Sequence, residues 1–380
     1  MRCLRHNNPA NAGCPIEIQF RNPTNEDTGS LTDLLEADAA RAESTLANFH
    51  GAPVFFPHAI GSGAADPQAQ LLFERSQASG SLGGNDPEAF LQHAAQNGWR
   101  PALENEFGAT SPGMLRAVAP NRTAWSYLFD LGPESRVLDL GCGTGGVACR
   151  LGKDHHVIAA DKSPINAAFV KLRGEQEKLP HFHSVCADGV DLPIADAQLD
   201  LVCMIGSFEW MPTSWPNEDP ETIHARVLSE AFRVLKPGGS LFLGIENRQY
   251  LGFALGMADP HARIRHVSYL DRDRANQLSL DLRGEPFLEY TYTRGEANAL
   301  LNNAGFKQVD DYWLRPDYST PNYIIPLNND HIIKYFIEER LNPWDYQGGR
   351  SFVYKIFRML PPHEVAEHVE FFGFCARKPS

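Results

Sequence analysis

A hydrophobic strand that runs directly into a glycine-rich turn is the feature of this sequence that most constrains its fold. Residues 136–140 read R-V-L-D-L, an apolar run typical of a strand covered on both faces. Glycines follow at positions 141, 143 and 145, and a turn without side chains lets a ligand approach the backbone closely. The N–H groups that open the next helix face the same spot. The sequence therefore predicts a site for a nucleotide-like cofactor.

The glycine turn alone does not choose the cofactor, because residues 141–146 also satisfy the dinucleotide pattern G-x-G-x-x-G. Asp139, two residues before the first glycine, places an acid at the turn. A carboxylate there suits an amino acid's ammonium better than a pyrophosphate, which favours S-adenosylmethionine. Asp161 ends the next apolar run, where a carboxylate accepts both ribose hydroxyls of either cofactor.

Further apolar runs at 184–187 and 199–205 end in Asp188-Gly189 and in Gly206-Ser-Phe-Glu-Trp210. Strands and helices alternate from residue 136 to residue 245, which predicts a parallel sheet with right-handed crossovers. The ends of four strands then converge on one crevice.

With these residues in order, the chain resembles the class I S-adenosylmethionine-dependent methyltransferases over roughly residues 115–315. The motifs that carry the resemblance are D-x-G-x-G-x-G at 139–145, Asp161, Asp188-Gly189, and the turn and strand L-K-P-G-G-S-L-F-L at 235–243. The resemblance implies a doubly wound Rossmann-like α/β fold with a mostly parallel sheet. It also implies that Asp161 holds the ribose and Asp188 meets the adenine amino group, with Phe208 near the adenine or the methionine moiety. The alternative is that Phe208 and Trp210 are core aromatics.

The predicted cofactor-site residues are Asp139, Gly141, Cys142, Gly143, Gly145, Asp161, Lys162, Asp188, Gly189, Gly206 and Phe208. The Cys142 thiol occupies a variable position of the glycine pattern, where the turn makes no demand for a thiol.

Later segments are similar to methyltransferases associated with bacterial surface-polysaccharide glycosyltransferases. They are residues 245–248, 259–261, 292–296, 304–306 and 315–318, with Pro321. This resemblance implies a sugar or glycolipid as the methyl acceptor and a glycosyltransferase as a possible partner. A homodimer is an alternative assembly.

We divide the chain into three parts. Residues 1–112 form a helical extension that acts as a lid, an interaction module or a dimerisation arm. Residues 113–315 form the methyltransferase domain, with an acceptor-pocket insertion after the fifth strand at 244–291. Residues 316–380 form a C-terminal extension. Helices are predicted at 31–49, 67–77, 87–97, 114–131, 223–235, 296–303 and 330–340, and strands at 306–313 and 369–376.

Methyl transfer is an in-line attack on a sulfonium methyl, so the protein's main task is to align the acceptor and exclude water. An acceptor hydroxyl benefits from a base. His261 is the first candidate, since an unperturbed histidine pKa near 6.5 suits proton abstraction at neutral pH; the alternative is a surface histidine. Glu209 follows the fourth strand directly and could hold either the acceptor or the cofactor. Further candidates are Glu246 and Asn247, for which helix capping or a loop hydrogen bond is the alternative, and Asp317 and Tyr318, for which a plain turn is the alternative.

We expect chemistry without a metal. His155 and His156, and likewise His181 and His183, lack a Cys or an acid at zinc-like spacing. A catechol-type magnesium site would require an aspartate at the end of the fourth strand, where this chain has Gly206-Ser207.

A formal net charge of −13 over 380 residues argues against a broad phosphate-binding surface, so nucleic acid is not expected as a substrate. The seven cysteines lack C-x-x-C spacing, which is typical of a reduced compartment. No eighteen-residue apolar run and no signal-peptide pattern occur, so we expect a cytoplasmic protein without an integral membrane segment.

Several alternatives stay open. The enzyme could serve specialised-metabolite biosynthesis, or it could use the sulfonium cofactor for a reaction other than methylation. The domain could also bind the cofactor only as a scaffold for a glycosyltransferase. An NAD oxidoreductase is disfavoured, because nothing after the first β–α unit supplies a recognisable hydride-transfer pair.

Overall fold

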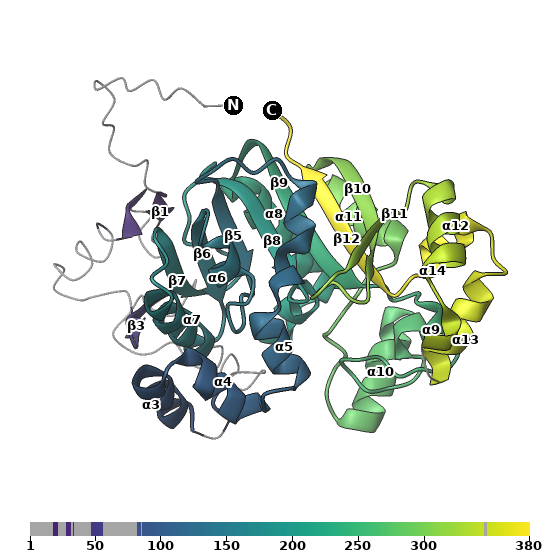
Figure 1. Ribbon diagram of the computed structural model, residues 1–380, viewed down its shortest axis with the longest axis horizontal. Helices are drawn as coiled ribbons and strands as arrows, with labels where there is room; N and C mark the ends of the chain where they lie inside the picture. The colour runs from purple at the N-terminus through teal and green to yellow at the C-terminus, as the bar shows by residue number, and fades with distance from the viewer. Residues whose placement is uncertain are drawn as a thin grey trace.

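The computed structural model describes residues 18–21, 28–31, 33, 47–55, 82–84, 86–345 and 348–380. Its main sheet contains β3 (Ala47–Phe49), β4 (Ala52–Phe55), β5 (Arg136–Leu140), β6 (His156–Asp161), β7 (Phe182–Ala187), β8 (Leu199–Ile205), β9 (Leu235–Glu246), β10 (Lys307–Arg315), β11 (Tyr323–Pro326) and β12 (Phe371–Arg377). The strand order across this sheet is β11-β10-β12-β9-β8-β5-β6-β7-β4-β3 (Figure 1). A separate pair consists of β1 (Phe20–Arg21) and β2 (Thr28–Gly29).

The centre of the sheet is parallel. Strands β4, β7, β6, β5, β8 and β9 pair in parallel in that spatial order, with Val137 opposite Val157 on one side and Leu201 on the other. Four of the five residues of β5 are buried, as expected for a strand covered on both faces. The predicted doubly wound, mostly parallel Rossmann-like fold is therefore confirmed.

Antiparallel strands complete both edges of the sheet. β12, the last strand of the chain, lies between β9 and β10, and β11 follows β10. The sheet therefore continues beyond residue 315 into the segment that we had assigned to a C-terminal extension. On the other edge, β3 pairs with β4.

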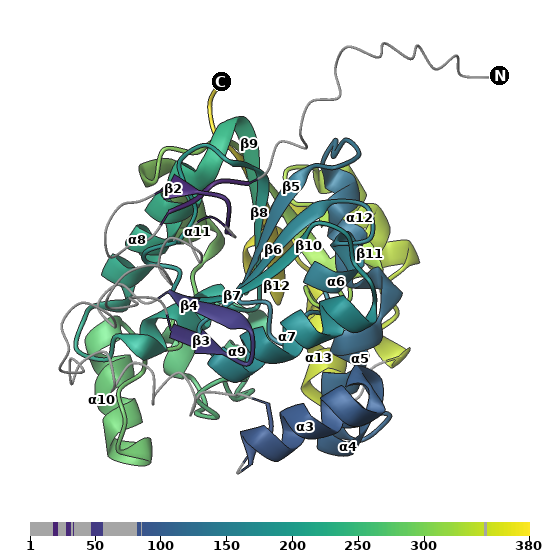
Figure 2. The ribbon, with the colours of Figure 1, turned by 90° about the vertical axis from the view of Figure 1, so that its left-hand side faces the viewer.

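Helices cover both faces of the sheet (Figure 2). The α-helices are α3 (Pro87–Asn97), α4 (Trp99–Phe107), α5 (Pro112–Val118), α6 (Ala148–Leu151), α7 (Pro164–Gln176), α8 (Pro220–Val234), α9 (Leu251–Ala254), α10 (Arg272–Arg283), α11 (Arg294–Asn303), α12 (Asp330–Glu339), α13 (Gly348–Phe357) and α14 (Pro362–His368). The 3₁₀ helices are η1 (Pro120–Leu128), η2 (Phe208–Ser214), η3 (Val267–Tyr269) and η4 (Pro343–Asp345). Helices α8 and α11 lie on one face, and α5, α6 and α7 lie on the other.

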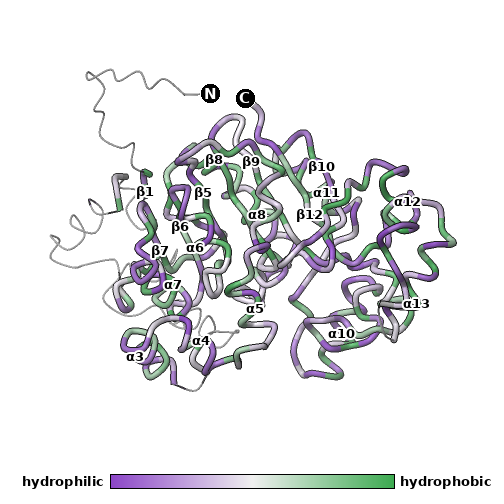
Figure 3. The backbone as a smooth tube through the Cα atoms, viewed as in Figure 1, coloured by the Kyte–Doolittle hydropathy of each residue, from purple (hydrophilic) through white to green (hydrophobic). Residues whose placement is uncertain are grey.

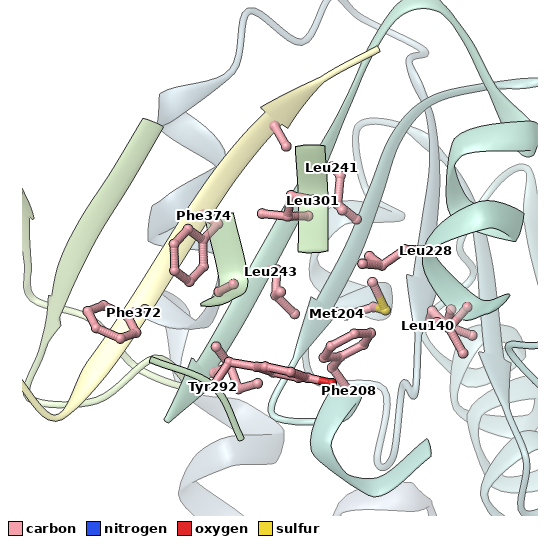
Figure 4. Close-up of a cluster of buried hydrophobic side chains, with 14 of the residues drawn as sticks. Leu140, Met204, Phe208, Leu228, Leu241, Leu243, Tyr292, Leu301, Phe372 and Phe374 are labelled. Carbon is pink, nitrogen blue, oxygen red and sulfur yellow. The ribbon is translucent and has the colours of Figure 1, made fainter. Parts of the chain in front are cut away.

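The core between the sheet and helices α8 and α11 is built from aliphatic and aromatic side chains (Figure 4). Its labelled members are Leu140, Met204, Phe208, Leu228, Leu241, Leu243, Tyr292, Leu301, Phe372 and Phe374. Hydrophobic residues concentrate in the strands, whereas hydrophilic residues are frequent in the outer helices and loops (Figure 3). Across the described residues, no helix is long and apolar enough to cross a membrane.

The predicted helix at 114–131 is wrong in its centre. The chain forms α5 and then η1, with Ala119 in an extended conformation (ψ 128°) between them. Pro120 explains the break, because proline lacks an N–H and disfavours the α conformation of the preceding residue.

The predicted helix at 31–49 is wrong at its end, where Ala47–Phe49 is a strand. His50 (φ 48°) and Gly51 (φ 82°) both adopt positive φ and form the two-residue turn of a hairpin with β4. The helical spacing of the apolar residues does not predict the structure here, because residues 47–49 pair with β4, which extends the main sheet beside β7. Residues 32 and 34–46, and the predicted helix at 67–77, lie outside the described residues.

The insertion at 244–291 is fixed to the end of β9 by Arg248. Its guanidinium donates to the carbonyl oxygens of Ser268 (3.1 Å) and Leu270 (2.8 Å) and to the hydroxyl of Tyr290 (2.5 Å). In Figure 1, α9 and α10 of the insertion lie toward the same end of the sheet as α3, α4 and α5, at the carboxyl ends of the parallel strands. This is the end at which a ligand crevice is expected in an open parallel sheet.

Candidate functional site

A cavity of about 380 Å³ opens at the carboxyl ends of β5, β6 and β8. Its lining residues are Arg116, Leu140, Gly141, Gly143, Asp161, Lys162, Asn166, Ala187, Gly189, Gly206, Ser207, Trp210 and Met211. A volume of this size lies in the usual range for small-molecule sites. Six of the predicted cofactor residues line it: Gly141, Gly143, Asp161, Lys162, Gly189 and Gly206.

The glycine turn is tied to the end of β6. The N–H of Gly141 donates to the carbonyl of Ala160 (2.8 Å), and the N–H of Gly143 donates to Oδ2 of Asp161 (2.8 Å). Both glycines have positive φ, 82° and 53°, a conformation that glycine adopts without steric cost. The turn therefore presents bare backbone to the cavity.

Asp161 is the carboxylate at the centre of this site. Its Oδ1 accepts hydrogen bonds from the N–H of Ser163 (2.9 Å) and from Nδ2 of Asn166 (3.2 Å). Burial raises its pKa, while the hydrogen bonds from Ser163, Gly143 and Asn166 oppose that shift. The carboxylate is thus held in one orientation between the turn and the start of α7.

Lys162 links the cavity to η2. Its Nζ donates to Oγ1 of Thr213 (2.6 Å), to Oγ of Ser214 (3.1 Å) and to the carbonyl of Trp210 (3.3 Å). Burial lowers the pKa of Lys162, and Asp188 and Asp161 oppose that effect. The lysine thereby positions the helix that carries Trp210 and Met211 into the cavity.

Other predicted cofactor residues lie behind the cavity wall. Asp139 accepts a hydrogen bond from the N–H of Ala148 (3.0 Å), and burial raises its pKa to about 6 against the opposing effect of Arg122. Asp188 accepts from Nε1 of Trp215 (3.1 Å) and from the N–H of Val190 (3.1 Å). Through these hydrogen bonds, both carboxylates connect the segments that surround the cavity.

Cys142, Gly145 and Phe208 are also absent from the lining. Burial raises the pKa of the Cys142 thiol well above its usual value, so the thiol is protonated. A Cβ on Gly145 would lie 3.1 Å from Sγ of Cys149, so this glycine permits close packing within the domain. Phe208 is fully buried and stacks on His224, with ring centroids 4.1 Å apart. The structure therefore gives Phe208 the core role that we had considered as the alternative.

Seven lining residues were not among the predicted cofactor residues: Arg116, Leu140, Asn166, Ala187, Ser207, Trp210 and Met211. Arg116 comes from α5, twenty residues before β5, and no local pattern connects it with the turn. For Asn166 a signal existed, since it lies in the first turn of the helix that follows Asp161.

A second group of side chains lies at the carboxyl ends of β8 and β9. We call Glu209, Glu246 and His261 the carboxylate–histidine cluster. Nε2 of His261 is 3.6 Å from Oε1 of Glu209 and 3.7 Å from Oε2 of Glu246. Glu209 is 0% exposed and Glu246 is 7% exposed. Three side chains that we had proposed separately as catalytic candidates therefore meet at one point.

Two neighbours hold this cluster. The hydroxyl of Tyr318 donates to Oε1 of Glu246 (2.7 Å). Oδ1 of Asp259 lies 3.6 Å from Nδ1 of His261 and accepts the N–H groups of His261 (2.9 Å) and Ala262 (2.8 Å).

The cluster adjoins the cofactor cavity. Trp210 lines the cavity, and its ring meets the ring of His261 edge-on with centroids 5.1 Å apart. Gly206 also lines the cavity, and a Cβ built on it would lie 2.4 Å from Cε2 of Tyr318. Trp210 and Tyr318 therefore connect the wall of the cavity with the cluster.

The charges around His261 make its imidazole more basic than the unperturbed histidine expected from the sequence. Burial alone would lower the pKa of His261, but Asp259, Glu209 and Glu246 together raise it to about 11. Burial and the neighbouring Glu209 raise the pKa of Glu246 to about 8, against the effect of His261. Without another cation, the imidazole is protonated at neutral pH, so an ordinary histidine pKa does not apply here.

The remaining two candidates have structural partners. Asn247 is fully buried, and its Nδ2 donates to the carbonyl oxygens of Glu367 and Val369, both at 2.8 Å. Asp317 accepts from the N–H of Thr320 (2.8 Å) and closes the turn that presents Tyr318. Of the pair 317–318, it is Tyr318 that reaches the cluster.

Comparison with known proteins agrees with this geometry. Residues 138–243 match the family model described as a methyltransferase domain. The matched segment contains most of β5, all of β6 to β8, most of β9 and the glycine turn, so it is a class I, S-adenosylmethionine-dependent methyltransferase domain of Rossmann-like fold. The predicted class of domain and its cofactor are thereby confirmed.

Individual curated proteins are similar over part of their length. EEF1A lysine methyltransferase 4 of Mus musculus is 28% identical over 176 residues, which are 44% of this chain and 64% of that protein. Phthiotriol/phenolphthiotriol dimycocerosates methyltransferase of Mycobacterium tuberculosis is 29% identical over 157 residues, 41% of this chain and 53% of that protein. Glycine/sarcosine/dimethylglycine N-methyltransferase of Actinopolyspora halophila is 31% identical over 204 residues, 52% of this chain and 31% of that protein.

The chain thus spans less than two thirds of the length of each of these relatives. A solved structure of Haemonchus contortus phosphoethanolamine N-methyltransferase 2 with S-adenosyl-L-methionine is 16% identical, with a TM-score of 0.42, over 77% of this chain and 60% of that chain. The three curated relatives are named for different acceptors, so the similarity defines the domain and leaves the acceptor open.

Proposed function

We propose that this protein transfers the methyl group of S-adenosylmethionine to a hydroxyl, or alternatively an amine, of a sugar, a glycolipid or another small metabolite. The main support for the proposal is that two sites lie next to each other at the carboxyl ends of the central strands. The cavity at the glycine turn has the features of a cofactor site, and the carboxylate–histidine cluster beside it has those of a polar acceptor site.

The residues of the cavity fit the cofactor. Gly141 and Gly143 leave the backbone bare, and Asp161 offers a fixed carboxylate for ribose hydroxyls. Leu140 and Met211 supply apolar surface suited to a base. Arg116 places a guanidinium at the cavity, where it suits the carboxylate of the cofactor's methionine moiety.

The bound cofactor supplies a methyl group on a positively charged sulfur. The protein must then hold the acceptor in line with the methyl carbon and keep water away. Glu209 and Glu246 lie where an acceptor oxygen needs hydrogen-bond partners and, as the methyl is transferred, a group that takes its proton. Trp210 covers one side of this point.

The choice of a sugar or glycolipid acceptor rests on the sequence resemblance together with the polarity of the cluster. Buried carboxylates suit hydroxyl and ammonium donors and disfavour an apolar acceptor. We also propose that residues 1–112, of which β3 and β4 belong to the main sheet, act as a lid or interaction module. A glycosyltransferase is the partner that the same resemblance suggests.

The first test is calorimetric titration of the purified protein with S-adenosylmethionine and S-adenosylhomocysteine, with NAD as the control. We expect micromolar binding of both sulfur compounds and none of NAD. Methyl incorporation into nucleotide sugars, glycans and small metabolites then identifies the acceptor. Cofactor binding without transfer to any of these acceptors would instead assign the domain a scaffold role.

A further inference from the structure

We propose that Glu209, Glu246 and His261 form a binding site for one divalent transition-metal ion, of the class of Mn²⁺ or Zn²⁺, beside the cofactor cavity. The evidence for the site is the geometry of these three side chains. Its catalytic role rests on the proposed methyl transfer.

The first observation is a set of buried carboxylate oxygens without hydrogen-bond partners, whose nearest cationic group is the His261 imidazole at 3.6 and 3.7 Å. Among the described residues, neither Oε1 nor Oε2 of Glu209 has a hydrogen-bond partner, although this residue is 0% exposed. Oε2 of Glu246 also has none among them. Buried carboxylates are normally paired, hydrogen-bonded or bound to metals, because an unpaired buried charge is strongly destabilising.

The second observation is the spacing of the ligand atoms. Nε2 of His261 lies 3.6 Å and 3.7 Å from the nearest oxygens of the two glutamates. A direct charge-assisted hydrogen bond would be about 2.7–2.9 Å long. Two ligand atoms that each lie about 2.1 Å from one shared ion are about 3.4–3.6 Å apart at angles between tetrahedral and trigonal. The two measured distances are close to this range, and all three ligand atoms lie within 4.8 Å of one another.

The third observation is that a neighbouring hydroxyl orients one of the ligands. The hydroxyl of Tyr318 donates to the other oxygen of Glu246 at 2.7 Å. Asp259, whose other oxygen accepts from Oγ of Ser268 (2.7 Å), places a carboxylate oxygen 3.6 Å from Nδ1 of His261, which is longer than a hydrogen bond. This carboxylate lies on the side of the imidazole where a metal site usually has one, because a carboxylate bound to the far nitrogen sets the tautomer and the ring orientation.

One imidazole and two carboxylates suit Zn²⁺, Mn²⁺ and related ions. The ion binds the neutral imidazole and displaces the proton that His261 otherwise holds. Three protein ligands leave a position open, as in catalytic sites. An acceptor hydroxyl in that position would lose its proton to solvent. Its oxygen would then form the O–C bond as the S–C bond of the cofactor breaks, with the electron pair left on sulfur.

The test uses the full chain after dialysis against a chelator. Calorimetric titration with Mn²⁺ and with Zn²⁺ is expected to show one ion per chain at this site. Co²⁺ added as a probe should give visible absorption from a site of low coordination number. We expect Glu209→Gln and His261→Asn to weaken ion binding at least a hundredfold. The control Glu364→Gln, in the exposed pair with His363, should bind ions as the unchanged protein does.

Tyr318→Phe gives a second measurement that does not touch a ligand. Loss of its hydrogen bond to Glu246 should lower the affinity for the ion about tenfold to a hundredfold. Titration of each variant with S-adenosylhomocysteine reports folding and the cofactor site separately. Cofactor binding without ion binding would therefore overturn the metal site and leave the proposed methyl transfer standing.

Two further outcomes would also overturn the metal site. One is equal weakening of ion binding by Glu364→Gln and Glu209→Gln, which would indicate nonspecific binding. The other is binding of ethanolamine, used as an ammonium probe, that depends on Glu209 while no ion binds. That result would assign the cluster to a cationic acceptor.

Discussion

Gly141 packs against Ser207 so closely that a Cβ on Gly141 would lie 2.3 Å from the Cβ of Ser207. The serine cannot easily move away, because its hydroxyl donates to the carbonyl of Leu140 at 2.7 Å. Gly143 provides a matched comparison: it also has positive φ (53°), but no atom of the described residues beyond its chain neighbours lies within 4 Å of a Cβ built on it. We expect Gly141→Ala to lower the free energy of unfolding by about 1–3 kcal/mol more than Gly143→Ala.

Urea denaturation of the two variants measures this difference. Because Gly143 lines the cavity, Gly143→Ala should keep most of the stability and still weaken S-adenosylhomocysteine binding. Equal stability of the two variants would contradict the close contact between Gly141 and Ser207.

The second prediction concerns Asp161. Asp161→Ala removes the acceptor for the N–H of Gly143 and for Nδ2 of Asn166, and it removes the carboxylate that faces the cavity. We expect S-adenosylmethionine affinity to fall at least a hundredfold, since several hydrogen bonds to one charged group are lost together. Calorimetry measures the affinity, and Asp200→Asn, at the start of β8, is the control. Unchanged affinity of the Asp161 variant would exclude it from the cofactor site.

Local sequence was sufficient for the parallel core and the cofactor turn. The glycines at 141 and 143 and the acid at 161 stand at fixed distances from strand ends, so the β–α–β unit determines their positions. Phe208 and Trp210 were harder to place. They lie in a 3₁₀ helix, which has about three residues per turn, and neither helical nor strand periodicity predicts which of them faces the cavity.

Pairing between distant segments could not be predicted. Nothing near residues 371–377 indicates that β12 inserts between β9 and β10, because this register is set by partners 59–70 residues away in β10 and 125–137 residues away in β9. The same applies to the carboxylate–histidine cluster. Each member was recognised from its place after a strand or in the insertion, but their meeting depends on the fold of residues 247–261.

The third prediction concerns the buried ion pair between Arg315 and Glu370. The Arg315 guanidinium donates to the hydroxyl of Tyr354 and to Oε1 of Glu370, and both charged residues are at most 3% exposed. Glu370→Leu leaves the guanidinium without its buried counter-charge, so the free energy of unfolding should fall by about 3–5 kcal/mol. The double variant Arg315→Met/Glu370→Leu should lose less. A double variant less stable than the single one in urea denaturation would contradict the charge argument.

The last prediction concerns the pH dependence of stability through His224. This residue is fully buried between the carbonyl of Phe208 (2.8 Å) and the hydroxyl of Tyr292 (2.6 Å). Burial lowers its pKa to about 3, despite the hydrogen bond with Phe208. In the unfolded chain the same imidazole titrates near 6.5. Below pH 6.5 the unfolded state therefore binds a proton that the folded state does not, and stability falls as the pH decreases toward 3.

Above pH 6.5 this residue adds no pH dependence, and below it the loss is about 1.4 kcal/mol per pH unit. His224→Gln should be less stable than the unchanged protein at pH 7, because it loses the paired hydrogen bonds. Its stability should nevertheless depend less steeply on pH between about 6 and 4, since it lacks the titrating group. His363→Gln, at an exposed histidine, is the control and should keep the original slope. Parallel curves for His224→Gln and the unchanged protein, measured by urea denaturation at each pH, would show that His224 is not the neutral buried imidazole described here.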